Sequence, residues 1–336
     1  MVHRPAMTDL ARTVLCFAGA AIMSGGLTAA LLPLLRRRSI IDQPNARSSH
    51  TAPTPRGGGA AVVATIVMSW SAVALLTTMT PSGFPRILIG IVVLAVVSGI
   101  EDVRGLSPVT RLGWQVVAVV GGLSALGSDQ MVFQGVMAPW LDRGLAALAW
   151  VWFVNLFNFM DGIDGITSVE TSTIGVGVAA VFLIGDAPVA GAYLASALAG
   201  AATGFLPWNW YRARLFMGDV GSVPTGYAVG YLLILVATRS YWVAALILPS
   251  YYLVDATVTL LRRVLRGQKP WEPHRDHFYQ VATPVGASHA VTVVKVLAAN
   301  VMLLALAIAS IWAPAYVCLA AAAIVVAVLL AVLANS

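Results

Sequence analysis

The chain has 336 residues, of which 59% are hydrophobic and only 10% are charged, with a formal net charge of +6. A soluble domain carries about 25% charged residues, so this composition excludes a single water-soluble core. The basic residues are scattered through short loops without interleaved aromatic residues, which predicts no nucleic-acid partner.

In chain order, the apolar residues form eleven blocks, most of them close to the roughly 20 residues that cross the hydrocarbon of a bilayer. The blocks cover residues 11–35, 59–79, 86–100, 113–127, 144–160, 171–185, 189–206, 222–238, 241–261, 287–309 and 312–333. We therefore predict an all-α, polytopic integral membrane protein with about eleven transmembrane helices, organised as one domain over residues 1–336.

The basic residues are unevenly divided between the loops that join these blocks. Fourteen of the twenty Lys and Arg residues lie in alternate loops, at 36–58, 101–112, 161–170, 207–221 and 262–286. Because basic residues accumulate on the cytoplasmic side of membrane proteins, we predict that these loops face the cytoplasm of a bacterial inner membrane. The N-terminus is then periplasmic, and nearly every polar cluster lies on the cytoplasmic side.

The first polar cluster links the first two blocks. It contains Asp42 and ends with Arg56 and three glycines, residues 57–59. Such a glycine run indicates backbone that approaches either a ligand or another helix.

The second cluster closes the third block with Glu101 and Asp102, followed by Arg104 and Arg111. Adjacent carboxylates at a membrane boundary repel each other unless a metal ion or a basic group offsets their charge. Two solvated loop acids are the alternative interpretation.

The third cluster, NLFNFMDGIDG, closes the fifth block. Asn155, Asn158 and Asp161 are spaced by three and would line one side of a helix, where polar groups are unfavourable without partners. Gly162 and Gly165 permit a tight turn. Helix capping would explain one Asp and one Gly but not the whole run, so we predict a functional site.

The fourth cluster, FMGDVGS, opens the eighth block and contains Phe216 and Asp219. A helix N-terminus presents free N–H groups that favour anions, although an Asp there could simply be an N-cap. A carboxylate beside an anion site indicates a cation as well. Mg²⁺ suits such a site because it keeps water ligands and binds substrate phosphates.

The fifth cluster contains His274, Arg275 and His277 and follows the ninth block. It comes after the basic residues Arg262, Arg263, Arg266 and Lys269. Because a third ligand at zinc-like spacing is absent from the sequence, we interpret the His/Arg loop as a site for phosphates or sugar hydroxyls. The preceding basic residues could instead attract anionic lipid head groups.

Together the five clusters resemble the polyprenyl-phosphate N-acetylhexosamine-1-phosphate transferase family, also called glycosyltransferase family 4. The resemblance extends from Asp42 to Gln280, and its most specific motifs are NxxNFMDGIDG and FMGDxGS. The PTPRGGG and HRxHxYQ segments resemble the branch that initiates O-antigen synthesis more than the phospho-MurNAc-pentapeptide translocase. The family usually has two aspartates where this chain has Glu101 and Asp102.

The resemblance also implies roles for individual residues. Catalytic roles fall to Glu101, Asp102 and Asp161. Asp219 would bind Mg²⁺, with Asn158 near it and Mn²⁺ as a substitute metal, while Asp164 and Phe216 would contact the uracil. The remaining substrate-binding residues would be Asn155, Arg56, Arg104, Arg111, His274, Arg275 and His277.

The implied reaction is attack by a polyprenyl phosphate oxygen on the β-phosphate of a UDP-sugar, with release of UMP. We expect undecaprenyl phosphate as the acceptor, UDP-GlcNAc as the first-choice donor, and a FucNAc- or QuiNAc-type donor as the alternative. Direct displacement is expected, with a covalent aspartyl phosphate as the competing route. A membrane transporter of an anionic solute and a non-catalytic scaffold are the rival functions, and a homodimer is an open alternative to a monomer.

Overall fold

The computed structural model describes residues 7–38, 41–43, 52–77, 83–185, 187–269, 274–284 and 288–336. Helices dominate, and the described residues contain a single antiparallel pair of two-residue strands, β1 (Ile41–Asp42) and β2 (Thr54–Pro55). The helices are α1 (Met7–Arg37), α2 (Gly59–Leu76), α3 (Phe84–Arg104), α4 (Pro108–Leu123), α5 (Pro139–Phe159), α6 (Ile166–Ile184), α7 (Ala190–Asn209), α8 (Asp219–Thr238), α9 (Trp242–Ile247), α10 (Ser250–Leu265), α11 (Phe278–Val281), α12 (His289–Ala309) and α13 (Ala315–Ala334).

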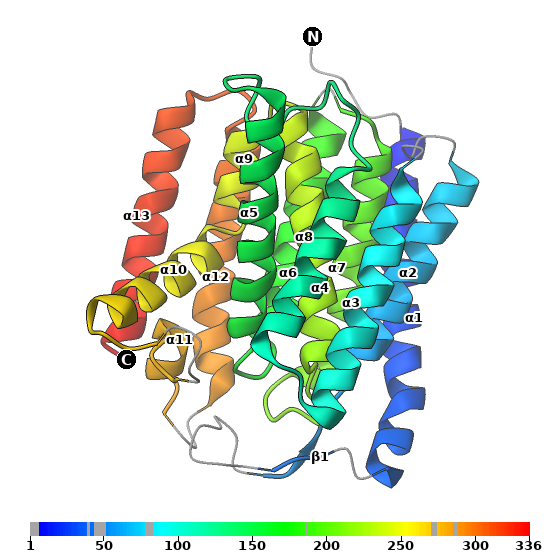
Figure 1. Ribbon diagram of the computed structural model, residues 1–336, viewed down its shortest axis with the longest axis vertical. Coiled ribbons are helices and arrows are strands. Elements are labelled where there is room, and N and C mark those ends of the chain that lie inside the picture. Colours follow the sequence, from blue (N-terminus) through cyan, green and yellow to red (C-terminus); the bar gives the residue numbers. More distant parts are fainter. Residues whose placement is uncertain are drawn as a thin grey trace.

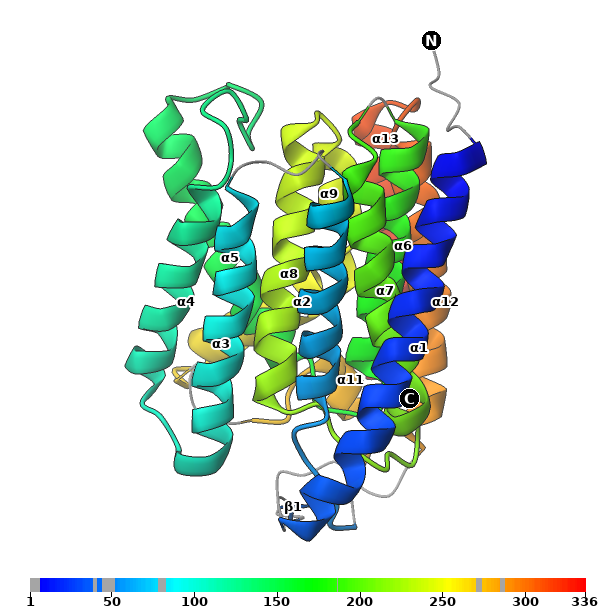
Figure 2. The same ribbon diagram turned by 90° about the vertical axis from the view of Figure 1, so that its right-hand side faces the viewer.

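Most of these helices stand side by side in one bundle (Figure 1). Within the described residues, seven are long and apolar enough to cross a membrane: α1, α2, α3, α6, α8, α12 and α13. Helices α4, α5 and α7 run alongside them, as Figure 2 shows from a second direction. The prediction of an all-α, polytopic membrane protein is therefore confirmed.

The ninth apolar block, predicted as one segment over 241–261, is two helices. Helix α9 ends at Ile247, and α10 begins after Pro249. Proline has no backbone N–H, so the helix loses the hydrogen bond to the carbonyl four residues earlier. Helix α10 then runs obliquely to the bundle (Figure 1), burying Tyr251 and Asp255 on one face and exposing Leu265 on the other.

Helix α8 forms the centre of the bundle, and nearly all of its residues are buried. Trp150 of α5 stacks on Tyr227 of α8 with ring centroids 4.6 Å apart, and its indole N–H donates to the Tyr227 carbonyl. Because α8 begins at Asp219, the central position of this helix places the Asp219 carboxylate near the middle of one end of the bundle.

The polar clusters meet at this same end. Strand β1, the end of α3, the α5–α6 turn, the start of α8 and α11 all lie at the bottom of the molecule in Figure 1, whereas α1 begins at the top. The predicted convergence of these loops is therefore found. That this end faces the cytoplasm of an inner membrane stays a prediction.

Glu170 lies inside a helix and not in a loop at the polar end, where the sequence placed it. The loop predicted at 161–170 ends earlier, because α6 begins at Ile166 directly after Gly165, whose φ of +80° favours glycine. Glu170 is therefore fully buried inside α6, where it accepts a hydrogen bond of 2.7 Å from the Asn300 amide of α12. It links two helices and takes no part in the polar end.

Candidate active site

Asp219 occupies the first turn of α8 and lies between two arginines. Its carboxylate is 3.2 Å from the Arg56 guanidinium and 3.8 Å from that of Arg111. Gly218 precedes it with φ +71°, a left-handed conformation that glycine adopts without strain. An acid in the first turn of a helix also interacts favourably with the helix dipole.

Arg56 reaches this position because its segment runs beside the FMGDVGS loop. The Phe216 N–H donates to the Pro55 carbonyl at 2.9 Å, and Arg56 and Phe216 form a parallel bridge. A side chain on Gly59 would overlap Gly221 at the start of α8. The glycine run thus serves close approach to another helix, one of the two alternatives that the sequence left open.

Glu101 and Asp102 avoid mutual repulsion by pairing with different arginines. Asp102 lies 2.5 Å from Arg56, and its second oxygen accepts from the Val220 N–H at 3.2 Å. Glu101 lies 2.7 Å from Arg111, so the longer side chain is used to reach α4. Only 18% of the Glu101 side chain and 8% of the Asp102 side chain are exposed, which contradicts the alternative of two solvated loop acids.

Arg104, predicted to bind substrate, is placed differently from Arg56 and Arg111. It is exposed at the end of α3 and has no ion pair with any residue that the structure describes. Its substrate-binding role stays a prediction.

Asp161 lies in the turn between α5 and α6. Burial raises the pKa of Asp161 to about 6, a hydrogen bond from the Thr167 hydroxyl lowers it, and the nearby charge of Asp219 raises it. Asn158 accepts a hydrogen bond from Ser222 at 2.5 Å, which joins the end of α5 to the start of α8. Asp161 and Asn158 therefore both belong to the Asp219 end of the bundle.

Asn155 points elsewhere. Its amide donates to Gln115 of α4 at 2.6 Å and to the Val151 carbonyl at 2.8 Å. It thus joins α5 to α4 one turn further into the bundle than Asn158. This contact gives Asn155 a structural partner, and its predicted substrate contact is untested.

Asp164 is almost entirely buried and organises the loop before α8. Its carboxylate accepts from the Ala213 N–H at 3.0 Å and lies 3.2 Å from His289. The neighbouring Gly165 N–H donates to Asn209 at 3.0 Å, and the Asn209 amide donates to the Leu215 carbonyl. Sequence reasoning missed Asn209 and His289, although both are polar residues at the ends of apolar blocks.

The His/Arg loop is anchored from α10. His277 is buried, with its Nδ1 atom 3.1 Å from Asp255, and its ring centroid lies 5.0 Å from that of His274. Burial and the nearby charges of His277 and Arg263 together lower the pKa of His274 to about 4. His274 is therefore neutral near pH 7. Arg275, between the two histidines, is half-buried and positively charged.

The side chains at this end of the bundle are compatible with the expected metal. Within the described ranges, no three His, Cys, Asp or Glu side chains converge closely enough to hold an ion by themselves. Mg²⁺ often binds through one or two carboxylates, waters and substrate phosphates, so a closed protein cage is not required. Asp219, Asp161 and Asn158 offer oxygen ligands at the same end of the bundle, which fits a Mg²⁺ ion held partly by water and substrate.

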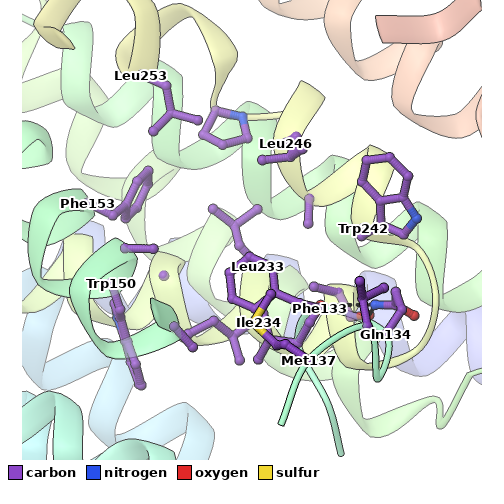
Figure 3. A pocket seen from close by; sticks show the side chains of 18 residues that line it. Phe133, Gln134, Met137, Trp150, Phe153, Leu233, Ile234, Trp242, Leu246 and Leu253 are labelled. Carbon is purple, nitrogen blue, oxygen red and sulfur yellow. Dashed lines mark hydrogen bonds between the residues drawn. The ribbon is translucent and has the colours of Figure 1, made fainter. Parts of the chain in front are cut away.

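Two apolar hollows lie in the helical part of the protein. One, of about 430 Å³, lies between α2 and α3 and ends at Val220, next to Asp219. The other, of about 550 Å³, lies between α5, α8 and α9 and is surrounded by side chains such as Trp150, Phe153 and Leu233 (Figure 3).

Comparisons with known proteins bear on this site. The model of the family "Glycosyl transferase family 4" matches residues 84–237, which include Glu101, Asp102, Asp161 and Asp219. The chain is 30% identical over 252 residues to a phospho-N-acetylmuramoyl-pentapeptide-transferase of Heliobacterium modesticaldum, covering 68% of this chain and 75% of that protein.

Two further relatives are similar over more of the chain. One is the probable undecaprenyl-phosphate N-acetylglucosaminyl 1-phosphate transferase of Bacillus subtilis, 27% identical over 279 residues. The other is a decaprenyl-phosphate N-acetylglucosaminephosphotransferase of Mycobacterium leprae, 27% identical over 312 residues. Each comparison covers 79% of this chain and 77% of the relative.

Proposed function

Because this chain belongs to glycosyl transferase family 4, we propose that it transfers a sugar 1-phosphate from a UDP-sugar to a polyprenyl phosphate and releases UMP. The observation that carries the proposal is the meeting of Asp219, Asp161 and Asp102 with Arg56 and Arg111 at one end of a membrane bundle. A site at a helix end lets a soluble nucleotide and a lipid phosphate reach the same atoms. The apolar hollow between α2 and α3, which ends next to Asp219, supports an acceptor with a long prenyl tail.

Within this reaction we propose UDP-GlcNAc as the donor and undecaprenyl phosphate as the acceptor. The names of the Bacillus and Mycobacterium relatives support both the N-acetylglucosaminyl group and a polyprenyl phosphate carrier. A FucNAc- or QuiNAc-type donor is the second candidate, and the product would initiate a cell-surface polysaccharide such as O-antigen. The transporter alternative is unsupported, because these relatives are named as transferases and the paired acids lie at a helix end.

The main task of the site residues would be to offset the negative charge of the two phosphates. An acceptor phosphate with a second pKa near 6 is largely dianionic at neutral pH, so bringing two anions together is harder than removing a proton. Arg56 and Arg111 place positive charge beside Asp219, and Mg²⁺ held by Asp219 and Asn158 would neutralise phosphate charge. Since Glu101 and Asp102 are both paired with arginines, we propose that they orient these cations in a direct displacement.

The reaction can be tested with purified protein, undecaprenyl phosphate, Mg²⁺ and a panel of UDP-sugars. We expect UMP release that requires both the lipid and UDP-GlcNAc, together with formation of a lipid-linked sugar. Exchange of a solute across proteoliposomes without UMP release would instead favour a transporter. Trapping of a labelled phospho-enzyme would contradict direct displacement.

Removal of the metal is expected to abolish UMP release. Chelation by EDTA leaves Asp219 and Asp161 without the cation that would join them to the substrate phosphates. Added Mg²⁺ should restore activity, and Mn²⁺ should restore part of it, whereas Zn²⁺ should not. Full activity after exhaustive chelation would contradict the metal assignment while leaving the substrates open.

The acid side of the pH profile is expected to have a midpoint near pH 6. As the pH falls through the raised pKa of Asp161, its carboxylate becomes neutral and kcat/KM, which reports on the free enzyme and the free substrate, should fall. Protonation of the acceptor phosphate adds to this fall in the same pH range. A raised carboxyl pKa means that this group stabilises the fold most below about pH 4, and that this contribution is lost as the pH rises through 6. Protonation of Asp161 therefore does not destabilise the fold, and it would not cause the loss of activity at low pH by unfolding the protein.

Thr167→Val provides the check on this assignment. The Thr167 hydroxyl lowers the pKa of Asp161, so its removal should move the midpoint of the kcat/KM profile to higher pH. An unchanged or lower midpoint in the variant would assign the acid side to another group.

A further inference from the structure

The His/Arg loop and the Asp161 turn are connected by one tyrosine. Tyr279 is fully buried in α11, and its hydroxyl donates to the Phe159 carbonyl at 3.0 Å. The same hydroxyl accepts from the Gly162 N–H. Phe159 lies two residues before Asp161 and Gly162 directly after it, so a single hydroxyl closes the turn that carries this carboxylate.

The space at Gly162 agrees with this role. A Cβ at Gly162 would overlap the Tyr279 hydroxyl. The Phe159 carbonyl belongs to the last turn of α5, where carbonyls lack helical partners and need another donor. The first glycine of the DGIDG sequence is thus required by the approach of Tyr279 and not only by the turn.

Asp255 of α10 fixes the direction of Tyr279. Its carboxylate is fully buried and accepts from the backbone N–H groups of Phe278 and Tyr279, at 3.1 and 3.4 Å. These are the first two N–H groups of α11, so a side chain from another helix supplies its cap. His277 also lies 3.1 Å from Asp255, and its ring stacks on Tyr279 with centroids 5.7 Å apart.

We infer that Tyr279 is a positioning residue that holds the Asp161 turn in place and couples it to the His/Arg loop through Asp255. The inference rests on the proposed function, because it assigns Tyr279 to the same site. Asp255 is then a structural cap and not an ion-pathway carboxylate, although it lies in a predicted apolar block.

The test begins with Tyr279→Phe, which keeps the ring and removes the hydroxyl. We expect kcat to fall by up to about 100-fold, the effect of displacing a group at the reaction centre by about 1 Å. The KM for the UDP-sugar should change little, because the ring still stacks on His277. The matched control is Tyr227→Phe, which keeps the ring that stacks on Trp150 and removes only a buried hydroxyl bonded to the Ala118 carbonyl at 3.0 Å. It should leave kcat near the wild-type value.

A double-mutant cycle separates positioning from general destabilisation. Gly162→Ala should be severely impaired by the overlap with the Tyr279 hydroxyl, and Tyr279→Phe should relieve part of that overlap in the double variant. Additive losses, or a Tyr279→Phe variant as active as Tyr227→Phe, would overturn the inference. Wild-type protein without UMP release on any donor would defeat the proposed function instead, so the two failures are distinguishable.

Discussion

Asp219→Asn is expected to lower kcat on the order of 1,000-fold, the upper end of the effect of removing one preorganised electrostatic group. The amide has nearly the same shape but loses the negative charge that would hold Mg²⁺ at the start of α8. The fold should survive, because a first-turn acid contributes only about 0.3–1 kcal/mol through the helix dipole. Arg56 also keeps its contact with Asp102.

UMP release at saturating substrates measures this effect, and gel filtration in detergent checks the fold. Asp129→Asn is the matched control, since Asp129 is an exposed carboxyl in the loop between α4 and α5 at the opposite end of the bundle. If the Asp219 variant keeps more than about a tenth of the wild-type rate, the charge of Asp219 does not have the role that we assign to it.

The convergence of Asp102, Asp161 and Asp219 could be predicted because membrane helices end at only two faces. Once the apolar blocks and the basic loops had assigned each polar cluster to a side, the far-separated motifs had to meet near one surface. The three-residue spacing of Asn158 and Asp161 at the end of an apolar block also predicts a polar site at that face. These inferences depend on hydropathy, on the distribution of basic residues and on the spacing of polar residues, all of which can be taken directly from the sequence.

The pairing of individual groups could not be predicted in the same way. Arg56 joins Asp102 to Asp219, and Asn300 meets Glu170, through contacts between helices that are distant in sequence. Hydropathy also averages over single residues, so it does not reveal that Pro249 ends one helix and starts another. Asp255 lies within the predicted apolar block 241–261, and its function as a cap depends on a loop that follows α10.

Arg56→Ala is expected to reduce both activity and stability. The variant leaves Asp102, with 8% of its side chain exposed, facing Asp219 without the cation between them. Breaking a fully buried pair costs about 3–5 kcal/mol, and the cost here should be smaller because 35% of the Arg56 side chain is exposed. UMP release should fall on the order of 100- to 1,000-fold, as for other electrostatic groups at a reaction centre.

Two companion variants separate these effects. Asp102→Asn in the Arg56→Ala background removes the unpaired charge, so thermal stability should recover while activity stays low. Arg56→Lys keeps the charge but lacks the planar fork that contacts both carboxylates, so it should regain stability and only part of the rate. Arg86→Ala is the control, because Arg86 is exposed at the opposite end, where it donates to the Ser124 carbonyl.

Thermal unfolding and UMP release measured on the same preparations decide between the two roles of Arg56. Recovery of both properties in the Arg56→Ala/Asp102→Asn variant would mean that Arg56 only neutralises Asp102. Recovery of stability alone, with a rate below that of Asp102→Asn by itself, would assign the guanidinium to the reaction itself. We expect the second result, because Arg56 reaches Asp219 as well as Asp102, and only Asp219 stands at the start of α8, where anions are favoured.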